Sequence, residues 1–69
     1  MGKRKRDRLK ANYMLLCRQY QALGAFLRGE AEAIAHNNMD LAMKSKRAAL
    51  GQYREIGEQL KRIADDVGV

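Results

Sequence analysis

The sequence predicts an all-α fold in which two long helices form an antiparallel hairpin, and three observations lead to this prediction. The 69 residues include no proline and are rich in Ala, Leu, Met, Arg, Lys, Gln and Glu, which favour helix. Apolar residues recur at alternating steps of four and three, the heptad spacing of packed helices. A short polar segment divides this pattern into two halves, as the turn of a hairpin requires.

The first helix is expected at about residues 7–36 and the second at about residues 39–66, within one domain that spans residues 7–69. In the turn between them, at residues 36–39, Asn37 and Asn38 suit a left-handed C-terminal position and an N-cap. The first stripe consists of Leu9, Tyr13, Leu16, Tyr20, Leu23, Leu27, Glu30 and Ile34, and the second of Met39, Ala42, Lys46, Ala49, Tyr53, Ile56, Leu60, Ile63 and Val67.

A fold-back at this turn would place stripe residues opposite each other when their numbers sum to 76. Leu16 then faces Leu60, and Tyr20 faces Ile56, so the tyrosines are expected in the core. The polar members, Glu30 and Lys46, also pair in this register. We therefore expect an ion pair between them that fixes the register more than it stabilises the fold.

Each helix also carries apolar or small residues beside its stripe, and this width exceeds what one partner helix covers. A core of this chain length rarely supplies more than about 3–5 kcal/mol without an additional source of stability. A second copy would cover the remaining surface and give a homodimeric four-helix bundle with coiled-coil packing. The alternative is that this surface is kept for a different protein.

Catalysis, cofactors and metals are not expected, because the chain has one Ser, no Thr, one His and one Cys. Cys17 and His36 would lie about five helical turns apart in the hairpin, at about 5.4 Å per turn. They therefore form neither a nucleophile and base pair nor a tetrahedral zinc site. No apolar run reaches the length of a membrane span, and the charged start lacks the features of a signal peptide. A cytoplasmic protein without membrane contact is therefore expected.

Positive charge is concentrated at the start of the chain. Residues 1–10 carry six basic side chains and one acidic one, a net +5 of the formal +6. We expect residues 1–6 to form a flexible basic arm, because positive charge is unfavourable in the first turn of a helix. The candidate contacts to DNA or RNA phosphates are Lys3, Arg4, Lys5, Arg6, Arg8, Lys10 and Lys44.

Two functions follow from these features. The first is a small non-enzymatic protein-interaction module, an adaptor or inhibitor of the type encoded by phages and mobile elements, which binds and blocks a larger bacterial regulatory or nucleic-acid-handling protein. Arg, Met and aromatic residues are enriched at binding surfaces, and the candidate contacts are Met14, Arg18, Phe26, Arg28, Met43, Arg47, Leu50 and Arg54. The alternative is a small basic regulator that binds DNA or RNA through its N-terminal arm.

Overall fold

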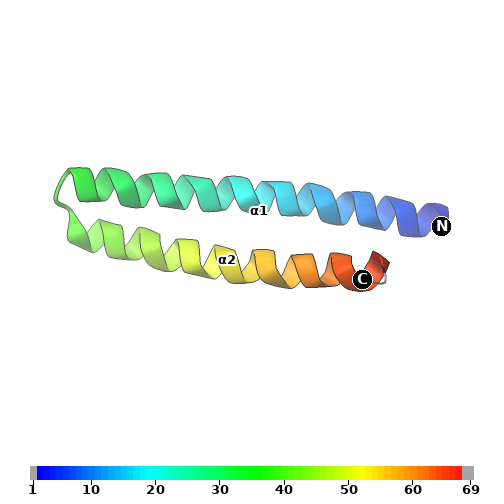
Figure 1. Ribbon diagram of the computed structural model, residues 1–69. Coiled ribbons are helices and arrows are strands. Elements are labelled where there is room, and N and C mark those ends of the chain that lie inside the picture. Colours follow the sequence, from blue (N-terminus) through cyan, green and yellow to red (C-terminus); the bar gives the residue numbers. More distant parts are fainter. Residues whose placement is uncertain (1, 68–69) are drawn as a thin grey trace.

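The computed structural model describes residues 2–67 and consists of two antiparallel helices joined by a short turn (Figure 1). Helix α1 spans Lys3–Ala35 and helix α2 spans Met39–Val67. The two helices lie side by side along their lengths, and the Cα atoms extend over 53 by 15 by 13 Å. The predicted all-α hairpin is therefore confirmed. Residue 1 and residue 69, which bound the predicted arm and domain, fall outside the described part of the chain.

The turn uses the two asparagines as predicted. Asn37 has a φ of 56°, in the left-handed region that Asn tolerates better than most residues. The backbone N–H groups of His36, Asn37 and Asn38 donate to carbonyl oxygens in the last turn of α1 at 2.8–3.1 Å. The Oδ1 of Asn38 then accepts the N–H of Leu41 at 3.1 Å, which caps the start of α2.

Helix α1 begins earlier than expected. The N–H of Arg6 donates to the carbonyl oxygen of Gly2 at 3.0 Å, so residues 3–6 belong to the helix instead of forming a separate arm. Lys and Arg are good helix formers, and this propensity continues the helix despite the unfavourable charge at its first turn. The first turns of α1 consequently reach beyond the end of α2 (Figure 1).

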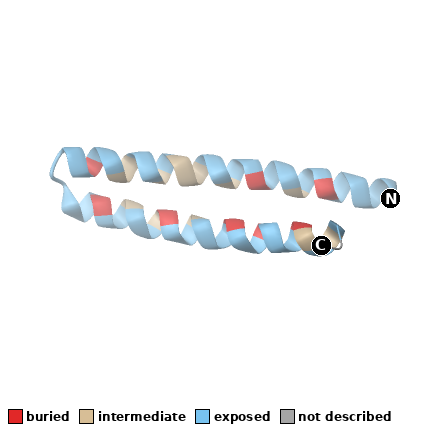
Figure 2. Cartoon of the chain, in the orientation of Figure 1, coloured by how far each residue is buried: buried red, intermediate tan, exposed pale blue. Residues whose placement is uncertain are grey.

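The hydrophobic core lies between the two helices, and its buried positions recur on their facing sides (Figure 2). We call this contact the inner seam. Leu16, Ile56 and Ile63 form its central cluster, against which Leu23 packs. The buried and half-buried side chains along the inner seam are Leu9, Asn12, Leu16, Gln19, Leu23, Phe26, Glu30 and Ala33 on α1, and Ala42, Ser45, Ala49, Gln52, Ile56, Gln59, Ile63 and Asp66 on α2.

The predicted pairing of the two stripes is only half right. Leu16 and Ile56 are buried, but Tyr20 is 51% exposed and Leu60 is 44% exposed. Gln19 and Gln59 take their places in the inner seam, which therefore uses the other flank of each stripe. Near the turn, the small residues Ala33 and Ala42 allow the helices to approach closely, and the next residue along α1, Ile34, is rotated away by about 100°.

Candidate protein-docking face

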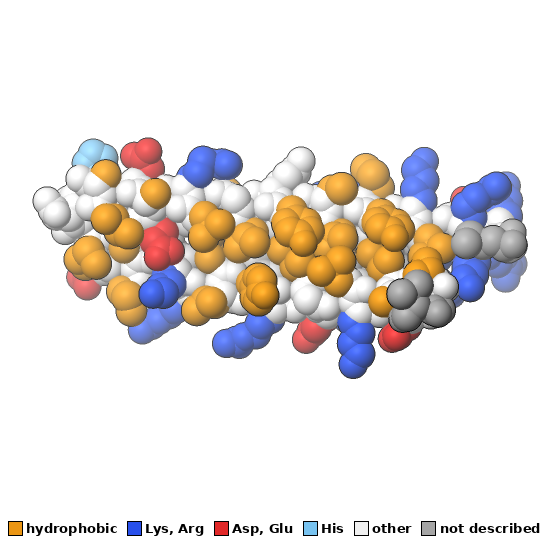
Figure 3. Space-filling model, viewed as in Figure 1, with side chains coloured by type: hydrophobic (Ala, Val, Ile, Leu, Met, Phe, Trp, Pro, Cys, Tyr) orange, Lys and Arg blue, Asp and Glu red, His pale blue; other side chains and the backbone are white. Residues whose placement is uncertain are grey.

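One side of the hairpin presents a continuous row of large hydrophobic side chains to solvent. Residues seven apart lie on the same side of packed helices. Eight large hydrophobic side chains follow this spacing along the two helices, and their exposed fractions are 41–67%. Figure 3 shows hydrophobic side chains covering the region where α1 and α2 meet along this side. We call this surface the apolar face, and its members are Tyr13, Tyr20, Leu27, Ile34, Met39, Tyr53, Leu60 and Val67.

The apolar face contains a shallow hollow of about 300 Å³ between the two helices. Its floor is formed by Leu23 and Ala49 of the inner seam, and its apolar walls by Leu27, Leu50 and Tyr53. Side chains from both helices thus line one depression that opens to solvent. The shape suits a side chain or helix of another protein, and it does not enclose a small molecule.

The polar members of the two stripes, Glu30 and Lys46, also line this hollow. An acidic and a basic side chain lie beside each other within the apolar surface in Figure 3. Among residues 2–67, however, the ion pair closer than 4.0 Å joins Arg8 to Asp66, and the His36 imidazole lies 3.8 Å from a Glu32 carboxylate oxygen. The expected Glu30–Lys46 ion pair is therefore not formed within the chain. Glu30 is half-buried, seven residues after Leu23 of the inner seam, whereas Lys46 is exposed.

Two glycines border the apolar face, and the other helix does not pack against either of them. A Cβ added at Gly57 would meet no atom within 4 Å, and one added at Gly24 would meet only the Arg28 side chain at 3.6 Å. Neither glycine position therefore lies against the other helix. Both leave room beside the apolar face for an approaching helix.

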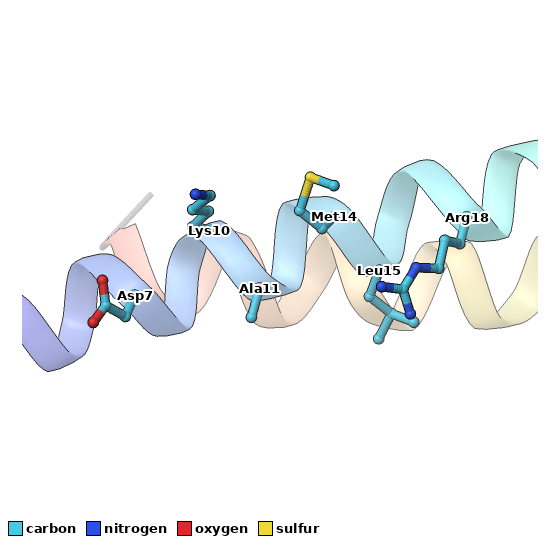
Figure 4. A pocket seen from close by; sticks show the side chains of 6 residues that line it. All are labelled: Asp7, Lys10, Ala11, Met14, Leu15 and Arg18. Carbon is cyan, nitrogen blue, oxygen red and sulfur yellow. The ribbon is translucent and has the colours of Figure 1, made fainter.

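The predicted protein-binding residues do not form one patch. Leu50 lines the hollow of the apolar face, Met43 is 48% exposed, and Phe26 is half-buried in the inner seam. Met14 and Arg18 lie instead on a depression formed by α1 alone, together with Asp7, Lys10, Ala11 and Leu15 (Figure 4). The other predicted arginines, Arg28, Arg47 and Arg54, are exposed.

The predicted nucleic-acid contacts also separate into two regions. Lys3, Arg4, Lys5, Arg6, Arg8 and Lys10 are exposed on the first turns of α1, at the open end of the hairpin. Lys44 lies near the start of α2, at the opposite end next to the turn. Arg8 donates to Asp66 Oδ1 at 3.1 Å, so one of the basic side chains is held by the end of α2.

Residues 2–67 contain no cluster of three or more His, Cys, Asp or Glu side chains that could hold a metal ion. Neither of the two described helices combines the length and apolar character that crossing a bilayer requires. Cys17 is an exposed free thiol on α1, and His36 lies at the turn. The structure does not bring these two reactive side chains together, since they lie on one helix about five turns apart.

Comparisons of the chain with protein-family models, curated proteins and solved structures give no significant match. The function is therefore argued from the chemistry of the surface. The apolar face is the largest departure from an ordinary surface in the described chain, because exposed hydrophobic side chains normally occur singly.

Proposed function

We propose that this chain is a non-enzymatic protein-interaction module whose apolar face packs against a second copy to complete a four-helix bundle. The observation that carries the proposal is the apolar face itself, with eight large hydrophobic side chains that are 41–67% exposed. Contiguous exposed apolar surface of this kind marks interaction sites in proteins.

The size of the apolar face supports a specific interface. The Cα extents of 53 and 15 Å give this side of the hairpin a footprint of about 800 Å². An interface of standard size buries about 800 Å² on each partner. The available surface is therefore large enough for a stable dimer.

The thin core supports the same conclusion. Among residues 2–67, seven hydrophobic residues are buried; three are alanines, and the large ones are Leu9, Leu16, Ile56 and Ile63. Conformational entropy opposes folding by about 1–2 kcal/mol for each ordered backbone residue. A second copy would double the number of helices around one core and bury the tyrosines and leucines that the single hairpin leaves exposed.

We further propose that the assembled bundle acts in the cytoplasm as an adaptor or inhibitor of the type encoded by phages and mobile elements, and blocks a larger bacterial regulatory or nucleic-acid-handling protein. With the apolar face covered, Met14 and Leu15 remain exposed on the outer surface of α1, next to Lys10 and Arg18. Apolar side chains beside an arginine are typical of protein-binding surfaces.

Sedimentation equilibrium of the full chain tests the interaction face. We expect a mass of twice the 7.9 kDa of one chain at ~10 µM, and loss of the dimer in Tyr20→Lys. Met14→Lys is the matched control, because Met14 is 52% exposed and Tyr20 is 51% exposed. A folded wild-type monomer, or equal behaviour of the two variants, would contradict the proposal.

The basic turns of α1 favour a second candidate function, a regulator that binds DNA or RNA backbones. The observation that favours this function is the row of exposed Lys and Arg side chains at residues 3–10. Fluorescence anisotropy with a generic duplex and a structured RNA at ~50 and ~200 mM salt tests it, with Lys3, Arg4, Lys5 and Arg6 changed to Ala as the comparison. Binding that survives the higher salt and disappears in the variant favours this function, and weak or salt-labile binding argues against it.

A further inference from the structure

We infer that the two copies of the proposed dimer lie with their turns at the same end, related by a two-fold axis along the hairpin, so that α1 of each copy packs on α2 of the other and Glu30 faces the partner's Lys46. This inference rests on the proposed dimer and assigns its topology.

Residue heights along the bundle support this topology. Helices rise about 1.5 Å per residue, so residues at equal distances from the turn lie at equal heights. With the axis along the hairpin, the α1 row of the apolar face packs on the α2 row of the partner, and Tyr20 lies at a height between the partner's Tyr53 and the partner's Leu60. Both rows belong to the apolar face, whereas Leu16, Ile56 and Ile63 stay buried in the inner seam. Each helix would thus use one flank within the chain and the other flank between chains.

A polar layer within the apolar face also supports the same-end arrangement. Glu30 and Lys46 line the same hollow, and no ion pair within 4.0 Å joins them among the described residues. In the same-end arrangement each Glu30 lies at the height of the partner's Lys46, and each Lys46 at the height of the partner's Glu30. The layer becomes four side chains of alternating charge, and every covered charge has an opposite charge beside it.

The opposite arrangement, with the turns at different ends, does not satisfy this layer. The row from Tyr13 to Ile34 would pack antiparallel on its own copy, which places Glu30 against the partner's Cys17. The row on α2 is centred on Tyr53, so Lys46 would meet the partner's Leu60. Each Glu30 would then share the hollow only with Lys46 of its own chain, and no ion pair within 4.0 Å joins these two among the described residues. Incompletely paired charges that are removed from water are strongly unfavourable.

Repulsion between the basic ends opposes the same-end arrangement, because residues 3–10 of both copies gather at one end. These side chains are exposed, and at physiological salt the repulsion between exposed charges more than about 8 Å apart is largely screened. Asp66 also neutralises Arg8 in each copy. A screened repulsion at the solvated end is weaker than a mismatch of covered charges, so the polar layer decides the topology. The bundle then displays twice six basic side chains at a single end.

Mixing two charge variants tests the pairing. Glu30→Lys and Lys46→Glu should each weaken homodimerisation at least tenfold, because each places like charges opposite each other. Mixed together, with one variant ¹⁵N-labelled, they should form heterodimers almost exclusively in native mass spectrometry. Glu32→Lys with Lys44→Glu is the matched control, since both residues are exposed and carry the same charges outside the apolar face. A heterodimer fraction of about one half, as in random mixing, would overturn the inference.

Distances between spin labels test the topology directly. The background is Cys17→Ala, and the labels are attached through Lys5→Cys at the open end or Glu32→Cys near the turn, both exposed positions. The same-end dimer gives a short distance in both samples. The opposite arrangement gives a Lys5→Cys separation of about 50 Å, close to the 53 Å length of the hairpin. A dimer with long distances overturns this inference alone, whereas a folded monomer without any intermolecular distance overturns the proposed function as well.

Discussion

The inner seam and the apolar face show two different uses of one heptad pattern. The inner seam mixes Leu9, Leu16, Ile56 and Ile63 with alanines and with the fully buried Gln59. The apolar face carries the larger set of hydrophobic side chains, and these are 41–67% exposed. The chain therefore places more of its large hydrophobic residues on the surface than in its core. This distribution is the basis for the proposed packing against a second copy.

Polar groups in the inner seam add to this contrast. Gln59 Nε2 donates to the carbonyl oxygen of Asn12 at 3.3 Å, and Arg62 donates to Gln59 Oε1 at 3.2 Å. The first bond links α2 to the backbone of α1, and the second, within α2, engages the other end of the same amide. The Oε1 of Gln19 is also buried, and no hydrogen-bond partner for it lies among residues 2–67. The inner seam thus contributes directional bonds, and the apolar face contributes hydrophobic area.

The largest expected effect comes from the inner seam itself. Ile56 is 3% exposed and belongs to the central cluster, so Ile56→Ala removes buried methyl groups and leaves a cavity. We expect a loss of about 2–5 kcal/mol in the free energy of unfolding, measured by chemical denaturation at several protein concentrations. The loss should persist in dilute samples, because the contact lies within one chain. An unchanged transition midpoint would show that the inner seam is misassigned.

A substitution on the apolar face should have a smaller effect on stability, and this effect should depend on protein concentration. Leu60 is 44% exposed in the single hairpin, so Leu60→Ala should destabilise the monomer less than Ile56→Ala does. Covering a leucine fully is worth about 1.5–3 kcal/mol, so covering the exposed part of Leu60 is worth about 1 kcal/mol per copy, and this should be lost from the proposed dimer. Sedimentation of wild type and variant measures the association, and thermal unfolding at low concentration supplies the control. An equal loss at every concentration would remove the distinction between the two surfaces.

The sequence predicted the hairpin, the turn and the central buried positions, because apolar periodicity and turn chemistry act locally. Asn37 and Asn38 perform the expected roles, and Leu16 and Ile56 are buried as expected. The flank that faces the other helix was assigned wrongly. An apolar pattern records which residues avoid water, but it does not say whether the same chain or another molecule covers them.

A signal for the correct flank was nevertheless present. Gln19 precedes Tyr20, and Gln59 precedes Leu60. Tyr20 and Leu60 therefore each follow a polar residue that could face the other helix in their place. The structure turns these polar residues inward. The candidate docking residues were scattered for a related reason. Met14 and Leu50 are both apolar and exposed, but the rotation of each helix places them on different surfaces.

The smallest expected effect sharpens the contrast within the inner seam. The buried Oε1 of Gln19 lacks a partner among the described residues, so Gln19→Leu removes an unsatisfied acceptor and adds apolar contact. We expect a gain of up to about 1 kcal/mol in the free energy of unfolding, measured by chemical denaturation. Gln59→Leu is the matched control, and it should lower stability, because it breaks the bond to the Asn12 carbonyl oxygen and frees Arg62. Losses of equal size in both variants would mean that Gln19 also makes a specific polar contact, and the inner seam would then be as fully bonded at Gln19 as it is at Gln59.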